Sequence, residues 1–148
     1  MFTIEREQWL PRPLDEVFAF FSRPENLQEI TPPWLDFRVM DAPQIPFPGA
    51  LIRYRLRWHG IPLRWTSEIT EWNPPHRFID RAISGPYAAW NHEHSFTGQG
   101  NGTLVRDRVQ YALPLGWLGV VAHKLRVSHD VERIFDFRAA RMRQLFPA

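Results

Sequence analysis

The chain has 148 residues, a formal net charge of +2 and a hydrophobic share of 44%, which suits one domain, residues 1–148, with one substantial core. It contains no cysteine, so a disulfide framework, a thiolate metal site and a cysteine nucleophile are excluded. The charged N-terminal segment does not look like a secretory signal, and no stretch approaches the roughly 18 apolar residues of a membrane span, so we expect a cytoplasmic protein without a transmembrane segment.

The first part of the chain predicts one strand and two short helices. Residues 2–10 alternate between apolar and polar side chains, which is typical of a strand, and the prolines of residues 11–13 end it. Apolar residues then recur up to Phe21 at the spacing of one helical face. A second short helix is predicted over about residues 22–30, before the prolines that follow Thr31.

The middle of the chain has a period of two. Apolar and polar residues alternate in the segments 52–58, 63–70, 78–83, 90–97 and 105–113. The turn sequences HGIP, NPPH, SGP and GQGNG separate these segments. Together with the first strand, they predict an antiparallel, curved sheet of six to seven strands in hairpin order.

The alternation sorts the side chains of this sheet into two rows of different chemistry. The row expected to face inward comprises Trp58, Trp65, Ser67, Phe78, Asp80, Trp90, His92, His94, Phe96, Asp107, Val109 and Tyr111. The row expected to face water comprises Arg53, Arg55, Arg57, Arg64, Glu68, Arg81, Glu93, Arg106 and Arg108. Because the arginines are spread along the strands rather than gathered in one block, we expect no nucleic-acid partner.

The last part of the chain, from about Leu118 to Leu145, has the period of a helix. Its arginines at 133, 138, 141 and 143 are expected mostly on the wet side. A sheet cannot leave an aromatic face in water, so this helix must lie across it. The predicted fold class is therefore α+β.

The order of strand, two short helices, meandering strands and long helix resembles the helix-grip fold of the START-like, or Bet v 1-like (SRPBCC), superfamily. The segments 10–37, 65–80, 85–96 and 103–119 resemble its bacterial polyketide cyclase/dehydrase-like branch, which includes CoxG-like proteins. The resemblance implies an apolar ligand enclosed between the sheet and the long helix. Because no catalytic motif spans these proteins, it transfers no catalytic residue.

Four polar residues of the inward row, Asp80, His92, His94 and Asp107, lie on three consecutive strands and must meet partners, water or a ligand. They could form a hydrogen-bonded network that only ties the strands together. They could also form the polar end of an apolar pocket, in which His92 or His94, held by an aspartate, acts as general acid or base. The residues expected to bind a ligand are Trp65, Ser67, Phe78, Asp80, Trp90, His92, His94, Asp107, Tyr111 and Phe135.

A metal site is a further alternative, because His92 and His94 point the same way from one strand and an aspartate could be a third ligand. An H-x-H pair alone is a weak signal, Glu93 faces away, and the resemblance implies no metal. We therefore expect no metal and no other cofactor.

These observations predict a protein that binds a hydrophobic small molecule of lipid, quinone or polycyclic aromatic type, as a monomer or weak homodimer. One alternative is an enzyme of cyclase, dehydratase or isomerase type that uses His92 or His94. Another is a chaperone or interaction module for a larger complex. A cavity filled by the protein's own side chains would favour that last alternative.

Overall fold

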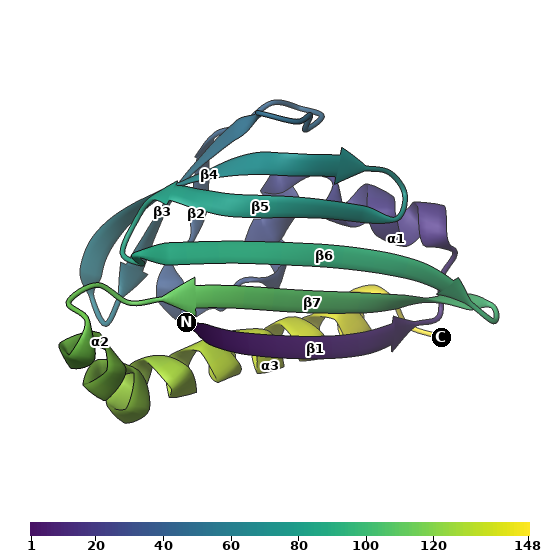
Figure 1. The fold of residues 1–148 in the computed structure, drawn as a ribbon. Helices are drawn as coiled ribbons and strands as arrows, with labels where there is room; N and C mark the ends of the chain where they lie inside the picture. Colours follow the sequence, from purple (N-terminus) through teal and green to yellow (C-terminus); the bar gives the residue numbers. More distant parts are fainter.

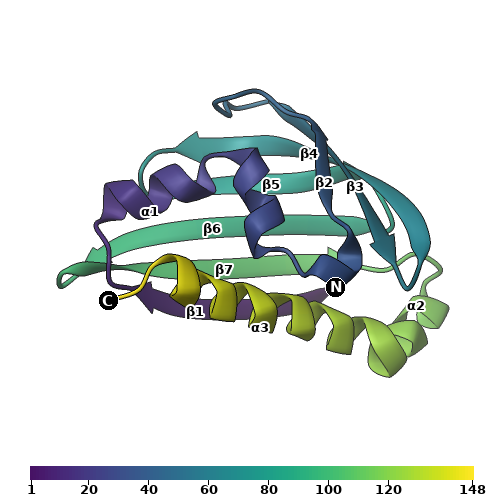
Figure 2. The same cartoon turned by 180° about the vertical axis from the view of Figure 1, so that it is seen from behind.

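The computed structural model describes residues 1–148, except for the side chains of Trp117 and Leu125. Over these residues, a curved antiparallel sheet of seven strands wraps around a long C-terminal helical segment (Figures 1 and 2). The α+β helix-grip architecture predicted from the sequence is confirmed.

The strands follow one another as hairpins, and the N-terminal strand closes the sheet beside the last one. The order across the sheet is β1-β7-β6-β5-β4-β3-β2, with every neighbouring pair antiparallel. The bounds are β1 Phe2–Leu10, β2 Arg38–Asp41, β3 Leu51–Trp58, β4 Ile61–Asn73, β5 Arg77–Ser84, β6 Ala89–Gln99 and β7 Gly102–Ala112. Strand β2 was not predicted individually, because its four residues are too few to show a period of two.

Three short helices connect β1 to β2 and lie over the concave face of the sheet (Figure 2). They are the α-helix α1 Leu14–Phe21 and the 3₁₀ helices η1 Pro24–Ile30 and η2 Pro33–Leu35. Helix α1 buries Val17, Phe18 and Phe21, which share one helical face. The second predicted short helix is thus present, as a 3₁₀ helix.

The C-terminal helical segment runs without a break from α2 Trp117–Ala122 through the π-helical turn η3 His123–Val127 to α3 Ser128–Leu145. Its predicted extent is confirmed, whereas the π-helical turn leaves no signal in the sequence. Helix α3 buries Val131, Phe135 and Met142 against the sheet. None of the described helices combines the length and the apolar character that crossing a membrane would require.

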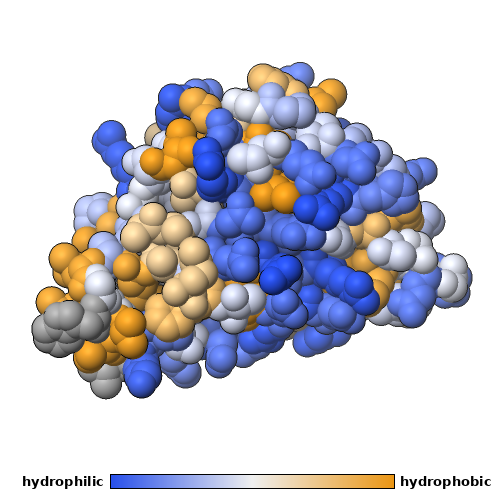
Figure 3. All heavy atoms as spheres, viewed as in Figure 1, coloured by the Kyte–Doolittle hydropathy of each residue, from blue (hydrophilic) through white to orange (hydrophobic). Residues whose placement is uncertain are grey.

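The two faces of the sheet differ as the alternation predicted. The convex face carries the arginine row, and Figure 3 shows it as a mostly hydrophilic surface over β5, β6 and β7. Cross-strand ion pairs join β1 to β7 on this face, at 3.1 Å between Arg106 and Glu7 and 3.3 Å between Arg108 and Glu5. Both ion pairs are exposed and contribute little to the free energy of unfolding. We therefore expect the concave side to supply most of the stability.

Aromatic packing anchors α1 to the concave face. Phe96, which is 2% exposed, packs edge-on to Phe18 at 5.2 Å between ring centroids and also contacts the rings of Phe21 and Phe78. Rings packed in this way fill the core at the end of the molecule where α1 lies.

Replacing Phe96 by alanine should lower the free energy of unfolding by about 3–5 kcal/mol, because it removes a buried ring and leaves a void between α1 and β6. Urea denaturation followed by tryptophan fluorescence measures this change. The control is Ile83→Ala on the exposed end of β5, which should change the stability by about 0.5 kcal/mol or less. Similar values for the two variants would contradict this description of the core.

Candidate functional site

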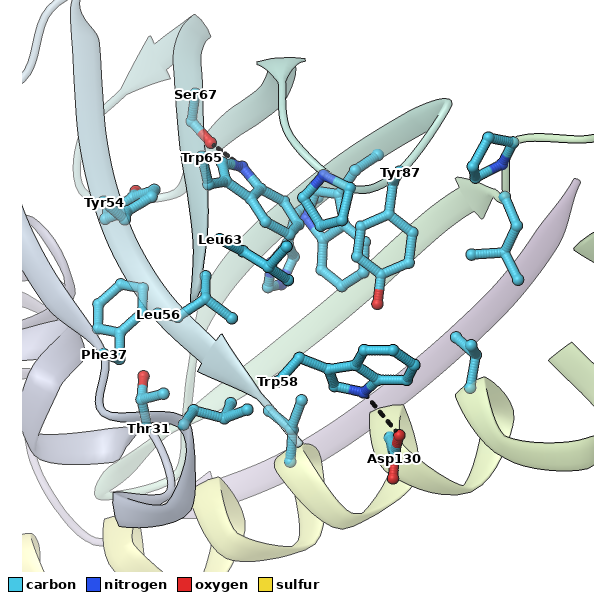
Figure 4. A pocket seen from close by; sticks show the side chains of 18 of the residues that line it. Thr31, Phe37, Tyr54, Leu56, Trp58, Leu63, Trp65, Ser67, Tyr87 and Asp130 are labelled. Carbon is cyan, nitrogen blue, oxygen red and sulfur yellow. Dashed lines mark hydrogen bonds between the residues drawn. The ribbon is translucent and has the colours of Figure 1, made fainter. Parts of the chain in front are cut away.

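A cavity of about 360 Å³ lies between the concave face of the sheet and the C-terminal helical segment. Aromatic and aliphatic side chains from β3, β4, β6 and the loop before β6 make most of its wall, with helices η1 and α3 on the opposite side (Figure 4). The apolar wall includes Phe37, Leu56, Trp58, Leu63, Trp65, Tyr87, Trp90 and Ile134. Such a space resembles the concave, largely apolar sites in which proteins bind small molecules.

The aromatic wall is held rigid by contacts among its own rings. Trp65 and Trp90 pack edge to face at 5.2 Å between centroids, and Tyr87 lies 4.8 Å from Trp90 and 5.4 Å from Trp65. The indole N–H of Trp65 donates to Ser67 Oγ at 2.9 Å. The rings of the wall therefore support one another.

One end of the cavity reaches the surface beside α2. Leu115, which is 75% exposed, and Leu118, which is 48% exposed, both line the cavity and also face outward. Figure 3 shows this end of the molecule as a hydrophobic area beside the hydrophilic convex face. We define Leu115 and Leu118 as the mouth of the cavity.

A hydrogen-bonded contact closes the side of the cavity between the β3–β4 hairpin and α3. Trp58 Nε1 donates to Asp130 Oδ2 at 2.9 Å (Figure 4). His59 Nε2 lies 3.1 Å from the same oxygen. Burial alone would raise the pKa of Asp130, but the bonds from Trp58 and His59 outweigh it and lower the pKa. The carboxylate therefore stays ionised at neutral pH and holds the hairpin to the helix.

Two aspartate–histidine pairs lie at the buried end of the cavity, which we call its deep end. His94 Nε2 donates to Asp80 Oδ2 and His92 Nε2 donates to Asp107 Oδ1, each at 2.7 Å. Directly opposite residues in the sheet are Asp80 with His92 and Asp107 with His94, so both hydrogen bonds run diagonally between strands. The two imidazole rings stack at 3.6 Å between centroids.

Burial and the neighbouring charges set the protonation of His94, Asp80 and Asp107. Removal from water, together with the nearby His92, lowers the pKa of His94 to about 4. Burial would raise the pKa values of Asp80 and Asp107, but hydrogen bonds from the histidines and the charge of Arg138 outweigh it and lower both. At neutral pH, His94 is therefore neutral with its proton on Nε2, and both carboxylates are charged.

Arg138 is a member of this cluster that the sequence reasoning placed on the wet side of the helix. Its side chain is 13% exposed, lines the cavity, and brings Nη1 to 3.9 Å from Asp107 Oδ1. The expectation was wrong because Arg138 follows buried Phe135 by three residues and precedes buried Met142 by four, so it shares their helical face. An inward Arg138 also places a positive charge near the buried carboxylates of Asp80 and Asp107.

The ten residues expected to bind a ligand divide into two groups. The cavity is lined by Trp65, Ser67, Asp80, Trp90, His92 and His94. In the described part of the chain, its lining does not include Phe78, Asp107, Tyr111 or Phe135. Phe78 belongs to the core beneath α1, and Tyr111 packs with Phe135 in a separate buried cluster. Asp107 lies behind the wall and accepts a hydrogen bond from His92. Alternation along a strand assigns a side chain to a face of the sheet but not to a position along that face. It therefore could not show that the strand residues Phe78, Asp107 and Tyr111 lie outside the cavity lining.

The lining residues that were not expected to bind a ligand include Tyr54, Tyr87, Asp130 and Arg138. Tyr54 lies in the same alternating row as Trp58, so the period of two could have identified it. Tyr87 precedes β6 in a loop, where periodicity gives no signal.

The metal alternative has some geometric basis, since donor atoms of Asp80, His92 and His94 lie within 4.8 Å of one another. A cation could bind these histidines only through Nδ1, because each Nε2–H already donates to an aspartate. It would also meet the positive charge of Arg138 in the same cluster. These donors fit a hydrogen-bonded network better than a metal site.

Comparisons with known proteins agree with this architecture. The family model of polyketide cyclases / dehydrases and lipid transport proteins matches residues 10–136. No curated protein matches the chain.

Several solved structures are similar in fold. Protein Ms6760 from Mycobacterium smegmatis has a TM-score of 0.72 at 19% identity, over 97% of this chain and 89% of that one. Protein TTHA0849 from Thermus thermophilus has a TM-score of 0.64 at 23% identity, over 95% and 96%. Major latex-like protein 151 from Panax ginseng has a TM-score of 0.61 at 13% identity, over 89% and 95%. At these identities the similarity establishes the fold.

The depressed pKa of His94 should make the protein less stable as the pH falls from 6.5 to 4. In this range His94 is protonated in the unfolded chain, where its pKa is near 6.5, but stays neutral in the folded protein. Proton binding therefore favours the unfolded chain, and the free energy of unfolding should fall by a few kcal/mol. In His94→Gln, whose amide N–H can still donate to Asp80, the fall should be smaller. Urea denaturation at pH 7 and pH 4.5 measures both slopes.

The control for this experiment is His76→Gln, which removes an exposed histidine. It should keep the wild-type dependence on pH. If His94→Gln and wild type lost the same stability between the two pH values, His94 would not be neutral in the folded protein.

Proposed function

We propose that this chain, which belongs to the family of polyketide cyclases / dehydrases and lipid transport proteins, binds a hydrophobic small molecule between its sheet and α3. The observation that carries the proposal is the cavity of about 360 Å³, with an apolar wall and a cluster of polar groups at its deep end. Removal of apolar ligand surface from water, at about 25 cal/mol per Å², would drive binding. The polar groups would set the orientation of the ligand.

Within the classes lipid, quinone and polycyclic aromatic molecule, the wall favours a ligand with flat rings. Trp58, Trp65, Tyr87 and Trp90 offer ring faces and edges around the space, and aromatic pairs gain energy from stacked and edge-to-face packing. The apolar mouth at Leu115 and Leu118 gives such a molecule a route from outside. We infer a cytoplasmic monomer or weak homodimer that carries or presents its ligand without contacting nucleic acid.

Filling the cavity with a protein side chain should abolish binding while leaving the fold intact. Leu63 points into the space from β4 (Figure 4), so Leu63→Trp would occupy volume that a ligand needs. The neutral polycyclic dye Nile red should bind the wild type with a rise in fluorescence. Its affinity for Leu63→Trp should be at least about tenfold weaker.

The matched control is Arg64→Trp, which adds the same ring to the convex face one residue along the strand. It should bind Nile red like the wild type. A wild type that fails to bind the dye, or two variants with equal affinity, would argue against a ligand site in this cavity.

A second candidate function, a cyclase-, dehydratase- or isomerase-type enzyme, is favoured by one specific observation. His92 and His94 each line the cavity and each contact an aspartate at 2.7 Å. A histidine oriented by a carboxylate is a suitable general base, and the aspartate stabilises the charge that the imidazole gains. His92, paired with Asp107, would take a proton from a carbon next to a ligand carbonyl.

Exchange of carbon-bound protons in D₂O tests this candidate with 2-tetralone, a bicyclic ketone that has such acidic C–H groups. Proton NMR should show deuterium incorporation above the buffer rate, and His92→Gln should slow it at least about tenfold. The Arg64→Trp variant should exchange like the wild type. Equal rates for wild type, His92→Gln and buffer would leave the protein as a binding protein.

A concave site filled by the protein's own side chains would have favoured the third prediction, a chaperone or interaction module. The open cavity does not give it that support.

A further inference from the structure

Arg138 is a buried cation, and two of its hydrogen-bond donors have no acceptor in the described part of the chain. Its Nε and Nη1 atoms are shielded from solvent and have no hydrogen-bond partner among the described residues. The guanidinium lies 5.2 Å from the ring of Phe135, and Asp107 Oδ1 is 3.9 Å from Nη1, beyond hydrogen-bond range. Buried donors without acceptors are costly, so this side chain is arranged for a partner that the protein does not supply.

The nearby carboxylates already have other donors. Asp107 Oδ1 accepts from His92 Nε2, and Asp80 Oδ2 accepts from His94 Nε2. Each of these two oxygens therefore has a hydrogen-bond donor other than Arg138, which forms only a longer ion pair with Asp107 at 3.9 Å. Because Arg138 also lines the cavity, the space from which an acceptor can reach it is the ligand space.

We propose that Arg138 is a specificity-determining residue that binds an acidic oxygen group, of the carboxylate class, on the ligand. This inference rests on the proposed function, since it assigns the polar end of the molecule that the cavity would hold. A guanidinium presents a planar set of donors that matches a carboxylate, and charged hydrogen bonds of this kind are the strong ones. The ligand would then be an apolar acid, with its body against Trp65, Tyr87 and Trp90 and its acid group at α3.

Two pairs of compounds that differ only at the polar end test the inference. One pair is 1-naphthaleneacetic acid and 2-(1-naphthyl)ethanol, and the other is decanoic acid and decan-1-ol, so that both ring and chain bodies are covered. Competition with Nile red at pH 7 gives the affinity of each compound. The wild type should bind the acid of at least one pair about tenfold or more tightly than the alcohol.

Arg138→Gln should abolish this preference by weakening the acid, while the affinity for the alcohol changes about twofold or less. Arg138→Lys, which keeps the charge but not the planar donors, should fall between the two. The matched control is Arg143→Gln, an exposed arginine on the same helix, which should keep the wild-type preference.

The possible outcomes separate this inference from the proposed function. If the wild type binds Nile red but binds acid and alcohol equally in both pairs, Arg138 only balances Asp80 and Asp107, and the inference fails while the binding function stands. If the wild type does not bind Nile red, the proposed function itself fails. The wild-type comparison needs no variant, so it decides the question even if Arg138→Gln does not fold.

Discussion

Two carboxylates in the concave interior, those of Asp80 and Asp107, constrain the arrangement of the rest of the site. A buried carboxylate needs hydrogen bonds and positive charge to remain ionised. His94 and His92 supply the hydrogen bonds from β6, and Arg138 supplies the charge from α3. The network thereby joins the middle of the sheet to the helix, and it gathers the polar groups at one end of an otherwise apolar space.

Hydrogen bonds tie α3 to β1 and to β3, which lie toward opposite edges of the sheet. On one side, Gln8 Nε2 on β1 donates to the carbonyl of Ala139 at 2.8 Å. On the other, Trp58 at the end of β3 donates to Asp130 at the start of α3. The sheet curves away from the helix between these contacts (Figure 1), and the rings of the wall pack on one another rather than across the space. The polar network and the open volume therefore lie together between the sheet and α3.

The sequence predicted the sheet, its two faces and the closing helix, because a period of two and a period near 3.6 report directly on burial. It also identified Asp80, His92, His94 and Asp107 as inward polar residues. It could not give their pairing, because diagonal hydrogen bonds depend on register and rotamer. It placed Arg138 on the solvent side together with the neighbouring arginines of the helix. Its inward position follows only when the negative charges of the facing strands are considered. Phe78 and Tyr111 are inward but do not line the cavity, since depth depends on where α1 and α3 pack.

A long-range ¹H–¹⁵N NMR spectrum of the imidazole rings, recorded at pH 7 with and without Nile red, tests the central claim most directly. The account predicts that His94 is neutral with its proton on Nε2. It also predicts that the His92 and His94 signals shift when the dye fills the cavity, whereas those of the exposed His76 and His129 do not. A doubly protonated His94, or unchanged His92 and His94 signals in the presence of bound dye, would contradict it.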